Sequence, residues 1–183
     1  NGFIAAAGGV PVKISNTYID LRVQKWRSEE MGILVGTRTA VGDNPRLNNR
    51  LWTGSSPVRL ILDRDGKVPR SHHVWDGSIP TIFIAAAAAE REGLTETLQL
   101  DFNGALLPRL MQELHQRQIQ SVLVEGGHNL LQQFIAGGLW DEARIITGTA
   151  TLPGGLAAPV LTNAVHAAAC ELSGDRIDCY YPA

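Results

Sequence analysis

Residues 121–135 constrain the fold of this 183-residue chain more than any other stretch. Residues 122–124 are apolar and form a short run of the kind found in buried parallel strands. Gly126 and Gly127 interrupt that run. Four apolar residues then follow at helical spacing: Leu130, Leu131, Phe134 and Ile135. The pattern predicts a buried strand, a glycine turn and a helix.

This predicted unit has two interpretations. Glycine lets a ligand approach the backbone closely, and the first turn of a helix offers free N–H groups to a phosphate. Glu125 ends the predicted strand, at the edge where open α/β sheets place their ligand crevice. The alternative is a tight turn between two core elements, with Glu125 as a solvated charge.

A second junction between a predicted strand and a loop is rich in polar groups. Residues 33–35 indicate a buried strand, and a polar segment follows it as far as Arg50. The hydroxyls of Thr37 and Thr39 suit a phosphate or a ribose, and the guanidinium groups of Arg46 and Arg50 suit an anion. An ordinary capped turn is the alternative interpretation.

The remaining elements follow from the same patterns. Apolar runs predict strands at residues 57–63, 81–85, 98–100 and 143–147. One helix is expected after a cap at Ser15-Asn16, and another is expected to start close to Leu107. Residues 167–172 and 176–181 predict a closing hairpin with Cys170 and Cys179 as core residues. The alternation indicates an α/β fold, with a mostly parallel central sheet, helices on both faces and an antiparallel C-terminal hairpin.

Composition narrows the classes of function. The length suggests one domain over residues 1–183, and the formal net charge of −2 gives no basic field for nucleic acid. No apolar run is long enough for a membrane span, and no signal peptide is expected. Two cysteines make no disulfide framework, so a reduced cytoplasmic setting is the expectation. The five histidines show no metal-ligand spacing, so no metal is expected.

Four segments together resemble a known family. They are Ile-Leu-Val-Gly-Thr-Arg-Thr-Ala-Val-Gly-Asp-Asn-Pro-Arg-Leu-Asn-Asn-Arg at 33–50, Pro-Val-Arg-Leu-Ile-Leu-Asp at 57–63, Val-Leu-Val-Glu-Gly-Gly at 122–127 and Leu-Trp-Asp-Glu at 139–142. In this order they resemble the reductase domain of the bifunctional riboflavin-biosynthesis deaminase/reductase, which has the dihydrofolate-reductase-like fold. The resemblance covers nearly the whole chain. Its specificity lies in the pairing of Gly-x-x-Thr-x-x-x-Asp-x-Pro-x-Leu with Glu-Gly-Gly.

The resemblance implies an oxidoreductase of riboflavin biosynthesis. The implied reaction is the NADPH-dependent reduction of 5-amino-6-(5-phosphoribosylamino)uracil to 5-amino-6-(5-phosphoribitylamino)uracil. The ribosyl ring opens and a hydride reaches its C1′. The resemblance also implies a homodimer that binds a small phosphorylated uracil compound.

Matching positions imply the site residues. Arg27, Leu47, Arg50 and Glu125 match substrate contacts, and the two arginines could clamp the phosphate. The implied contacts of NADPH are Lys13, Thr39, Asp43, Arg64, Gly127, His128, Asn129, Leu130, Leu131, Gln132 and Gln133. Lys13 stands at a position that is often Trp, and Arg64 at one that is often Ser. Catalysis needs an acid for the ring oxygen, and Glu125, Asp43 and an ordered water are the candidates.

Two departures from the family keep other interpretations open. The family's first strand and its Lys-x-Ala-x-Ser-Leu-Asp-Gly motif are cut, so we expect a fragment or one domain of a longer protein. The chain has no His-x-Glu and no Pro-Cys-x-x-Cys, so it is not expected to deaminate. The alternatives are an NADPH-dependent reductase of the same fold that acts on a pterin-like substrate, and a non-catalytic nucleotide-binding or dimerising domain.

Overall fold

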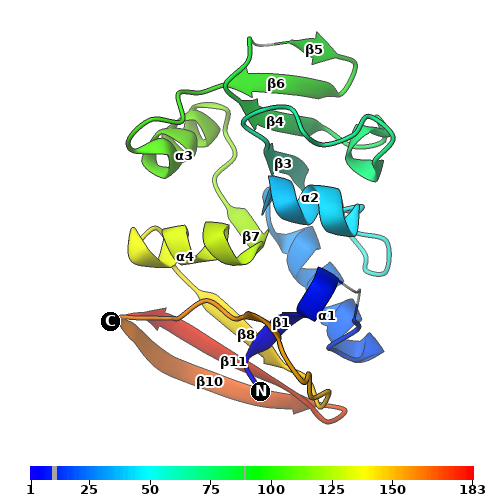
Figure 1. Ribbon diagram of the computed structural model, residues 1–183, viewed down its shortest axis with the longest axis vertical. Helices are drawn as coiled ribbons and strands as arrows, with labels where there is room; N and C mark the ends of the chain where they lie inside the picture. The colour runs from blue at the N-terminus through cyan, green and yellow to red at the C-terminus, as the bar shows by residue number, and fades with distance from the viewer. Residues whose placement is uncertain (10–11, 89) are drawn as a thin grey trace. The chain divides into compact units, whose positions relative to one another are not determined.

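The computed structural model describes residues 1–9, 12–88 and 90–183, which fold as two compact units (Figure 1). Unit 1 consists of Asn1–Val23 and His128–Ala183, and unit 2 is Gln24–Gly127. Helix α1 (Thr17–Glu29) therefore contributes its first seven residues to unit 1 and the rest to unit 2. Among the described residues, no helix combines the length and the apolar character needed to cross a membrane.

Unit 2 is built on a six-stranded sheet. Its strands are β2 (Gly32–Gly36), β3 (Val58–Leu62), β4 (Thr81–Ala85), β5 (Arg91–Glu92), β6 (Thr95–Gln99) and β7 (Val122–Gly126). They lie in the order β5-β6-β4-β3-β2-β7, and β5 is the one antiparallel member among the described strands. Strand β6 begins at Thr95 rather than Leu98, because the preceding threonines also pair with β4. The predicted mostly parallel sheet is confirmed.

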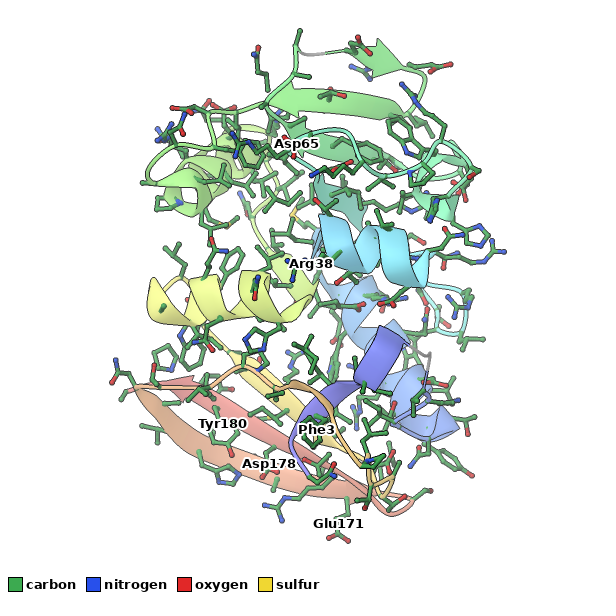
Figure 2. All side chains as sticks on the ribbon, viewed as in Figure 1. Phe3, Arg38, Asp65, Glu171, Asp178 and Tyr180 are labelled. Carbon is green, nitrogen blue, oxygen red and sulfur yellow. The ribbon has the colours of Figure 1, made fainter. Side chains whose placement is uncertain are left out.

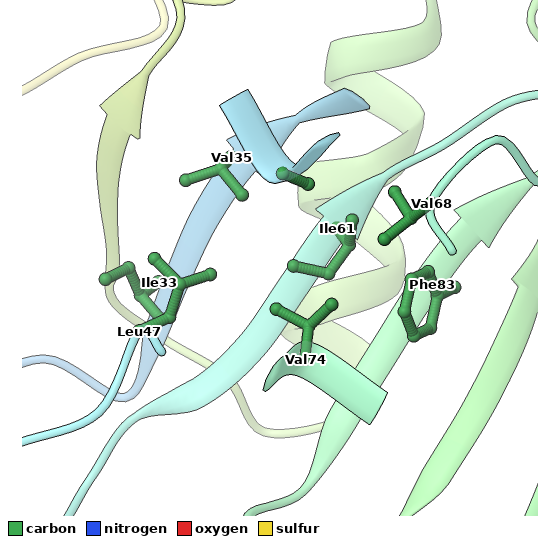
Figure 3. Close-up of a cluster of buried hydrophobic side chains, with 8 residues drawn as sticks. Ile33, Val35, Leu47, Ile61, Val68, Val74 and Phe83 are labelled. Carbon is green, nitrogen blue, oxygen red and sulfur yellow. The ribbon is translucent and has the colours of Figure 1, made fainter. Parts of the chain in front are cut away.

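Helices cover both faces of this sheet, as predicted. Helix α2 (Thr37–Asp43) and the 3-10 helix η2 (His73–Trp75) lie over one face, and α3 (Leu106–Gln116) lies over the other (Figure 3). The first face carries the main apolar cluster: Ile33, Val35, Ala40, Leu47, Ile61, Val68, Val74 and Phe83. The buried stripe of α3 is Leu107, Leu110 and Leu114. Apolar side chains on both faces explain the continuous apolar runs of the strands.

Unit 1 is mainly antiparallel. Its elements are β1 (Phe3–Ala6), η1 (Ala7–Gly9), the start of α1, α4 (His128–Ala136), β8 (Ala143–Thr147), β9 (Gly155–Ala157), β10 (Ala164–Leu172) and β11 (Asp175–Pro182). The order β10-β11-β8 forms one sheet, and β1 pairs with β9. Glu171, Asp178 and Tyr180 share one face of the three-stranded sheet (Figure 2). The predicted closing hairpin is therefore confirmed.

A polar cap fixes the start of α1 in unit 1. The Oδ1 atom of Asn16 accepts the backbone N–H groups of Tyr18 and Ile19, at 2.9 and 3.1 Å. The backbone N–H of Asn16 donates in turn to the buried carboxylate of Asp175 at 2.6 Å. Asn16 is thus the helix cap predicted at Ser15-Asn16, since it satisfies two N–H groups of the first turn.

The prediction that both cysteines are core residues is wrong. Cys170 is exposed and Cys179 is half-buried. Cys170 lies on β10, which is the edge strand of its sheet and exposes nearly every side chain. The alternation along the hairpin indicated strands correctly, but it could not reveal that the outer strand exposes most of its side chains.

Candidate active site

The carboxyl ends of β2 and β7 bring the predicted polar residues of unit 2 to one edge of the sheet. The two strands are parallel neighbours, with Leu34 opposite Val124 and Val35 opposite Gly126. Helix α2 starts directly after β2, and Glu125 is the last residue but one of strand β7. Parallel strands end at the same edge, which is where α/β sheets bind ligands.

Arg27 and Glu125 form a two-pronged ion pair at this edge. The Nε atom of Arg27 donates to Glu125 Oε1 at 2.8 Å, and Nη2 donates to Oε2 at 2.6 Å. The side chains are only 11% and 22% exposed, respectively. The short, parallel hydrogen bonds fix the plane of the carboxylate. The sequence predicts a substrate contact for both residues, but it contains no sign that they bind each other.

Helix α1, which carries Arg27, also holds the loop that carries Leu47 and Arg50. Arg27 Nη1 donates to the backbone carbonyl of Asn48 at 3.1 Å. The Leu47 side chain is buried in the apolar cluster, whereas Arg50 is exposed. Arg50 Nη1 donates to Asn48 Oδ1 at 3.2 Å. Arg27 therefore links Glu125 to the loop, and Arg50 presents its guanidinium to solvent from that loop.

A close approach between Gly127 and Thr39 leaves bare backbone at the end of β7. A Cβ atom built on Gly127 would lie 2.9 Å from Thr39 Oγ1, so a side chain there would collide with the hydroxyl. Gly126 adopts a φ of 142°, which favours glycine, and its peptide bond to Gly127 is cis. The glycine pair and the half-buried Thr39 hydroxyl suit a polar ligand that lies against the backbone.

Asp43 and Arg64 lie at the ends of other elements in unit 2. Asp43 is the last residue of α2, and partial loss of hydration raises the pKa of its carboxyl although the residue remains exposed. Arg64 follows β3 and is exposed, with Asp65 3.6 Å away. Buried Asp63 accepts the backbone N–H of Val68 at 2.8 Å and so shapes the turn that carries Arg64.

The remaining predicted cofactor residues belong to unit 1. His128 opens α4, and its Nδ1 lies 2.8 Å from the carbonyl oxygen of Ala157. The Gln132 side chain bonds the backbone of Val160 in both directions: Oε1 accepts the N–H at 2.8 Å and Nε2 donates to the carbonyl at 3.3 Å. These contacts hold the segment around residues 157–160 against α4.

The other five predicted residues of unit 1 differ in their exposure and contacts. Leu130 is buried, so only its backbone is available to a ligand, and Leu131 is half-buried. Gln133 Nε2 donates to the carbonyl oxygen of Asn129 at 3.2 Å, one turn earlier in α4. Lys13 is exposed and pairs with Asp20 at 2.7 Å. Among the described residues, no group of three or more His, Cys, Asp or Glu side chains could hold a metal ion.

Sequence reasoning missed two polar residues beside the predicted ones. Gln24 is only 3% exposed, and its Oε1 accepts the backbone N–H of Arg50 at 2.9 Å. Asn48 holds both arginines, through its carbonyl and its side chain. The available signal was weak: Gln24 lies three residues before Arg27, on the same face of a helix, and Asn48 lies between two predicted contacts.

The sequence matches a known protein family and named relatives. The family model described as the RibD C-terminal domain matches residues 1–174. The riboflavin biosynthesis protein RibD of Bacillus amyloliquefaciens is 32% identical over 172 residues, which are 89% of this chain and 46% of that protein. The 2,5-diamino-6-ribosylamino-4(3H)-pyrimidinone 5′-phosphate reductase of Aquifex aeolicus is 31% identical over 76% of this chain and 70% of its own length.

Solved structures of related reductases are also similar to this chain. The deaminase/5-amino-6-(5-phosphoribosylamino)uracil reductase of Thermotoga maritima superposes with a TM-score of 0.88 at 26% identity, over all of this chain and 53% of that one. A dihydrofolate reductase from Enterococcus faecalis, solved with NADP(H), superposes with a TM-score of 0.52 at 13% identity and supports the fold alone. The chain thus spans about half the length of the Bacillus amyloliquefaciens and Thermotoga maritima relatives.

Proposed function

Because this chain belongs to the RibD C-terminal domain family, we propose that it reduces 5-amino-6-(5-phosphoribosylamino)uracil to 5-amino-6-(5-phosphoribitylamino)uracil in riboflavin biosynthesis. The relatives from Aquifex aeolicus and Methanothermobacter thermautotrophicus are named as 2,5-diamino-6-ribosylamino-4(3H)-pyrimidinone 5′-phosphate reductases. A reductase of the dihydrofolate-reductase-like fold uses a nicotinamide cofactor, and within this proposal the cofactor is NADPH.

One observation carries the proposal. Helix α1 joins the substrate residues of unit 2, since Arg27 binds Glu125 through two hydrogen bonds and binds the Leu47–Arg50 loop through the carbonyl of Asn48. An ordinary capped turn would not need a half-buried carboxylate held in a fixed plane. An arrangement in which each polar group orients the next is typical of a prepared binding site.

The substrate chemistry matches these groups. Arg50 is exposed and offers guanidinium N–H groups beyond the one that Asn48 accepts, so we assign the substrate phosphate to Arg50 first. Arg27 already donates hydrogen bonds to Glu125 and to the Asn48 carbonyl. Its remaining N–H groups give the phosphate a second, weaker contact. The fixed carboxylate of Glu125 accepts hydrogen bonds from a pyrimidine N–H or a ribose hydroxyl.

The residues present also fit the cofactor. Gly127 leaves bare backbone against Thr39 Oγ1 where a Cβ would collide, and such a cradle suits a phosphate or ribose oxygen. We propose Thr39, Asp43, Arg64 and Gly127 as cofactor contacts. Within unit 1 we propose Lys13 and residues 128–133, the latter through the N–H groups at the start of α4. NADPH, when bound, supplies the hydride that reaches C1′.

Asp43 is our proposed acid for the ring oxygen. Desolvation raises the pKa of its carboxyl, so the protonated form persists to higher pH than for a solvated aspartate. A group that must be protonated loses activity as pH rises through its pKa. We therefore expect kcat/KM of the parent to fall along a basic limb governed by Asp43.

Asp43→Asn removes that proton and is expected to lower kcat by about 10²-fold, within the range for a general acid. The variant should also lose the basic limb, which a pH profile of kcat/KM measures. Asp65→Asn changes an exposed turn aspartate of the same unit and serves as the control. A variant that keeps both its rate and the parent profile would leave Glu125 or a water molecule as the donor.

The decisive test of the function is NADPH oxidation by the full-length protein with freshly deaminated substrate. Arg50→Ala is expected to lower kcat/KM by about 50-fold, because a charge-assisted contact to phosphate is lost. Arg91→Ala is the control, since Arg91 is also an exposed arginine of unit 2 but lies on β5 and is assigned no contact. Equal losses of kcat/KM in both variants would contradict the assignment of the substrate phosphate to Arg50. NADPH binding without turnover would favour the non-catalytic interpretation.

We further propose a homodimer, as the family resemblance implies, and a cytoplasmic setting, as the low cysteine count indicates. Within unit 1, β10 is an edge strand, and Val165 and Tyr181 of the hairpin are 55% and 50% exposed. An unpaired edge with exposed apolar side chains favours association with another chain. A one-chain mass in light scattering would contradict the dimer.

A further inference from the structure

We propose that Gln24 is a positioning residue for the phosphate-binding loop, a role that rests on the function proposed above. Gln24 lies on α1 and is only 3% exposed, although its side chain is polar. Its Oε1 accepts the backbone N–H of Arg50 at 2.9 Å. The residue that is to hold the phosphate is therefore tied to a buried helix side chain through its own main chain.

The loop needs such ties because it has little structure of its own. Residues 44–50 belong to no helix or strand, and Leu47 adopts a φ of 50°, which is unfavourable for a residue other than glycine. Several contacts hold the segment, including the buried Leu47 side chain, the Arg46 carbonyl on Arg59, the Asn48 carbonyl on Arg27 and the Arg50 N–H on Gln24. The last two of these anchors come from α1.

The polarity of Gln24 has a structural cost that the loop contact explains. A buried amide oxygen without a partner is unfavourable, and an apolar side chain would pack at this position without that cost. The bond to Arg50 satisfies the oxygen and also a backbone N–H that the loop would otherwise leave unpaired.

A further contact joins the loop to α1. Gly54 lies further along the loop and packs against Ser28 of α1, where a Cβ on Gly54 would lie 3.0 Å from the serine Cβ.

The consequence concerns substrate affinity rather than chemistry. The backbone position of Arg50 sets where its guanidinium group can reach, and the bond from Nη1 to Asn48 Oδ1 narrows that range further. Gln24 touches neither substrate nor cofactor in this proposal. Its loss should weaken the binding of the phosphate and leave the reacting atoms unaffected.

Gln24→Met tests the role, because methionine keeps the length of the side chain and removes the acceptor. In the full-length protein we expect KM for the phosphorylated substrate to rise about ten-fold, with kcat within two-fold of the parent. Backbone amide exchange at Arg50 should accelerate by about ten-fold in the same variant. Gln24→Glu keeps an acceptor oxygen and should return KM to within about three-fold of the parent. Gln112→Met, on the exposed side of α3, is the matched control and should change neither quantity.

A double-mutant cycle separates positioning from a purely structural role. With Arg50→Ala already present, Gln24→Met should raise KM by less than about two-fold, because the guanidinium that it positions is gone. The substrate without its phosphate should show the same KM with the parent and with Gln24→Met. Independent, multiplicative effects of the two substitutions would overturn the proposal.

The outcomes also distinguish this inference from the proposed function. An active parent whose KM is unchanged by Gln24→Met contradicts the role of Gln24 and leaves the reductase intact. A parent without turnover contradicts the proposed function. In that case unaltered amide exchange at Arg50 in Gln24→Met would separately refute the anchor. Circular dichroism and urea unfolding of each variant establish that the compared proteins are folded.

Discussion

Glu125→Gln is expected to lower kcat/KM by about 10²- to 10³-fold while the protein remains folded. The substitution keeps the size of the side chain but removes its charge and one of the two acceptors for Arg27. Each ten-fold loss of kcat/KM is about 1.4 kcal/mol of transition-state stabilisation, so this range is about 3–4 kcal/mol, the size of a lost charge-assisted substrate contact together with a displaced Arg27. The loss of kcat/KM should exceed that of Arg50→Ala, because in our proposal Glu125 contacts the substrate and also orients Arg27.

Steady-state kinetics with the phosphorylated substrate measures the loss, and urea unfolding measures stability alongside. Arg27 is 11% exposed and keeps its bond to Asn48, so we expect the free energy of unfolding to fall by only about 1–2 kcal/mol. Glu92→Gln makes the same chemical change at an exposed position of unit 2 and should leave both quantities unaltered. Activity of Glu125→Gln within two-fold of the parent would exclude Glu125 from the site.

The strands and the site edge could be predicted because local pattern determines them. Residues 33–35 and 122–124 are apolar on both faces, and a glycine follows each run, at Gly36 and, after Glu125, at Gly126, so buried parallel strands were the favoured interpretation. The carboxyl ends of such strands meet at one edge, which places Glu125 near α2 without knowledge of distant contacts. These inferences needed only residues close to one another in the chain.

Contacts between residues far apart in the chain could not be predicted from the sequence. Arg27 and Glu125 are 98 positions apart, and nothing near either residue indicates that their side chains bind each other. Pairing of β9 with β1 joins segments about 150 residues apart, and its requirement for Gly155 becomes clear only from the approach of the Ala5 carbonyl. Gln24 was missed for a related reason: a glutamine in a helix indicates a solvated side chain until its burial is known.

Arg59 shows the same limit and leads to the largest expected effect on stability. The sequence places an arginine inside an apolar strand, and the structure buries it completely within β3. Its Nη1 donates to Asp76 Oδ1 at 2.8 Å and its Nε donates to the carbonyl of Arg46 at 2.9 Å. Arg59 thus connects the interior of the sheet to the Leu47 loop and to the segment that follows η2.

Asp76→Ala is expected to lower the free energy of unfolding by about 3 kcal/mol at neutral pH, because it leaves the buried Arg59 charge without its carboxylate. This value is at the low end for broken buried pairs, since the Asp76 side chain is 31% exposed. The substitution also removes the acceptor for the Ser78 backbone N–H, 3.0 Å from Oδ1. Urea unfolding of the parent and the variant measures the difference.

The difference should depend on pH with a defined sign. The hydrogen bond from Arg59 holds the pKa of Asp76 well below its usual range in the folded protein. A carboxyl whose pKa is depressed by folding stabilises the protein fully above its unfolded pKa, about 3.9, and loses that contribution as pH falls below it. We therefore expect a constant gap between parent and variant above about pH 5 that narrows below about pH 4. Asp65→Ala, at an exposed turn, should leave the free energy of unfolding nearly unchanged, because its ion pairs are solvated. A gap for Asp76→Ala as small as that of Asp65→Ala would mean that Arg59 is satisfied by its carbonyl contacts alone.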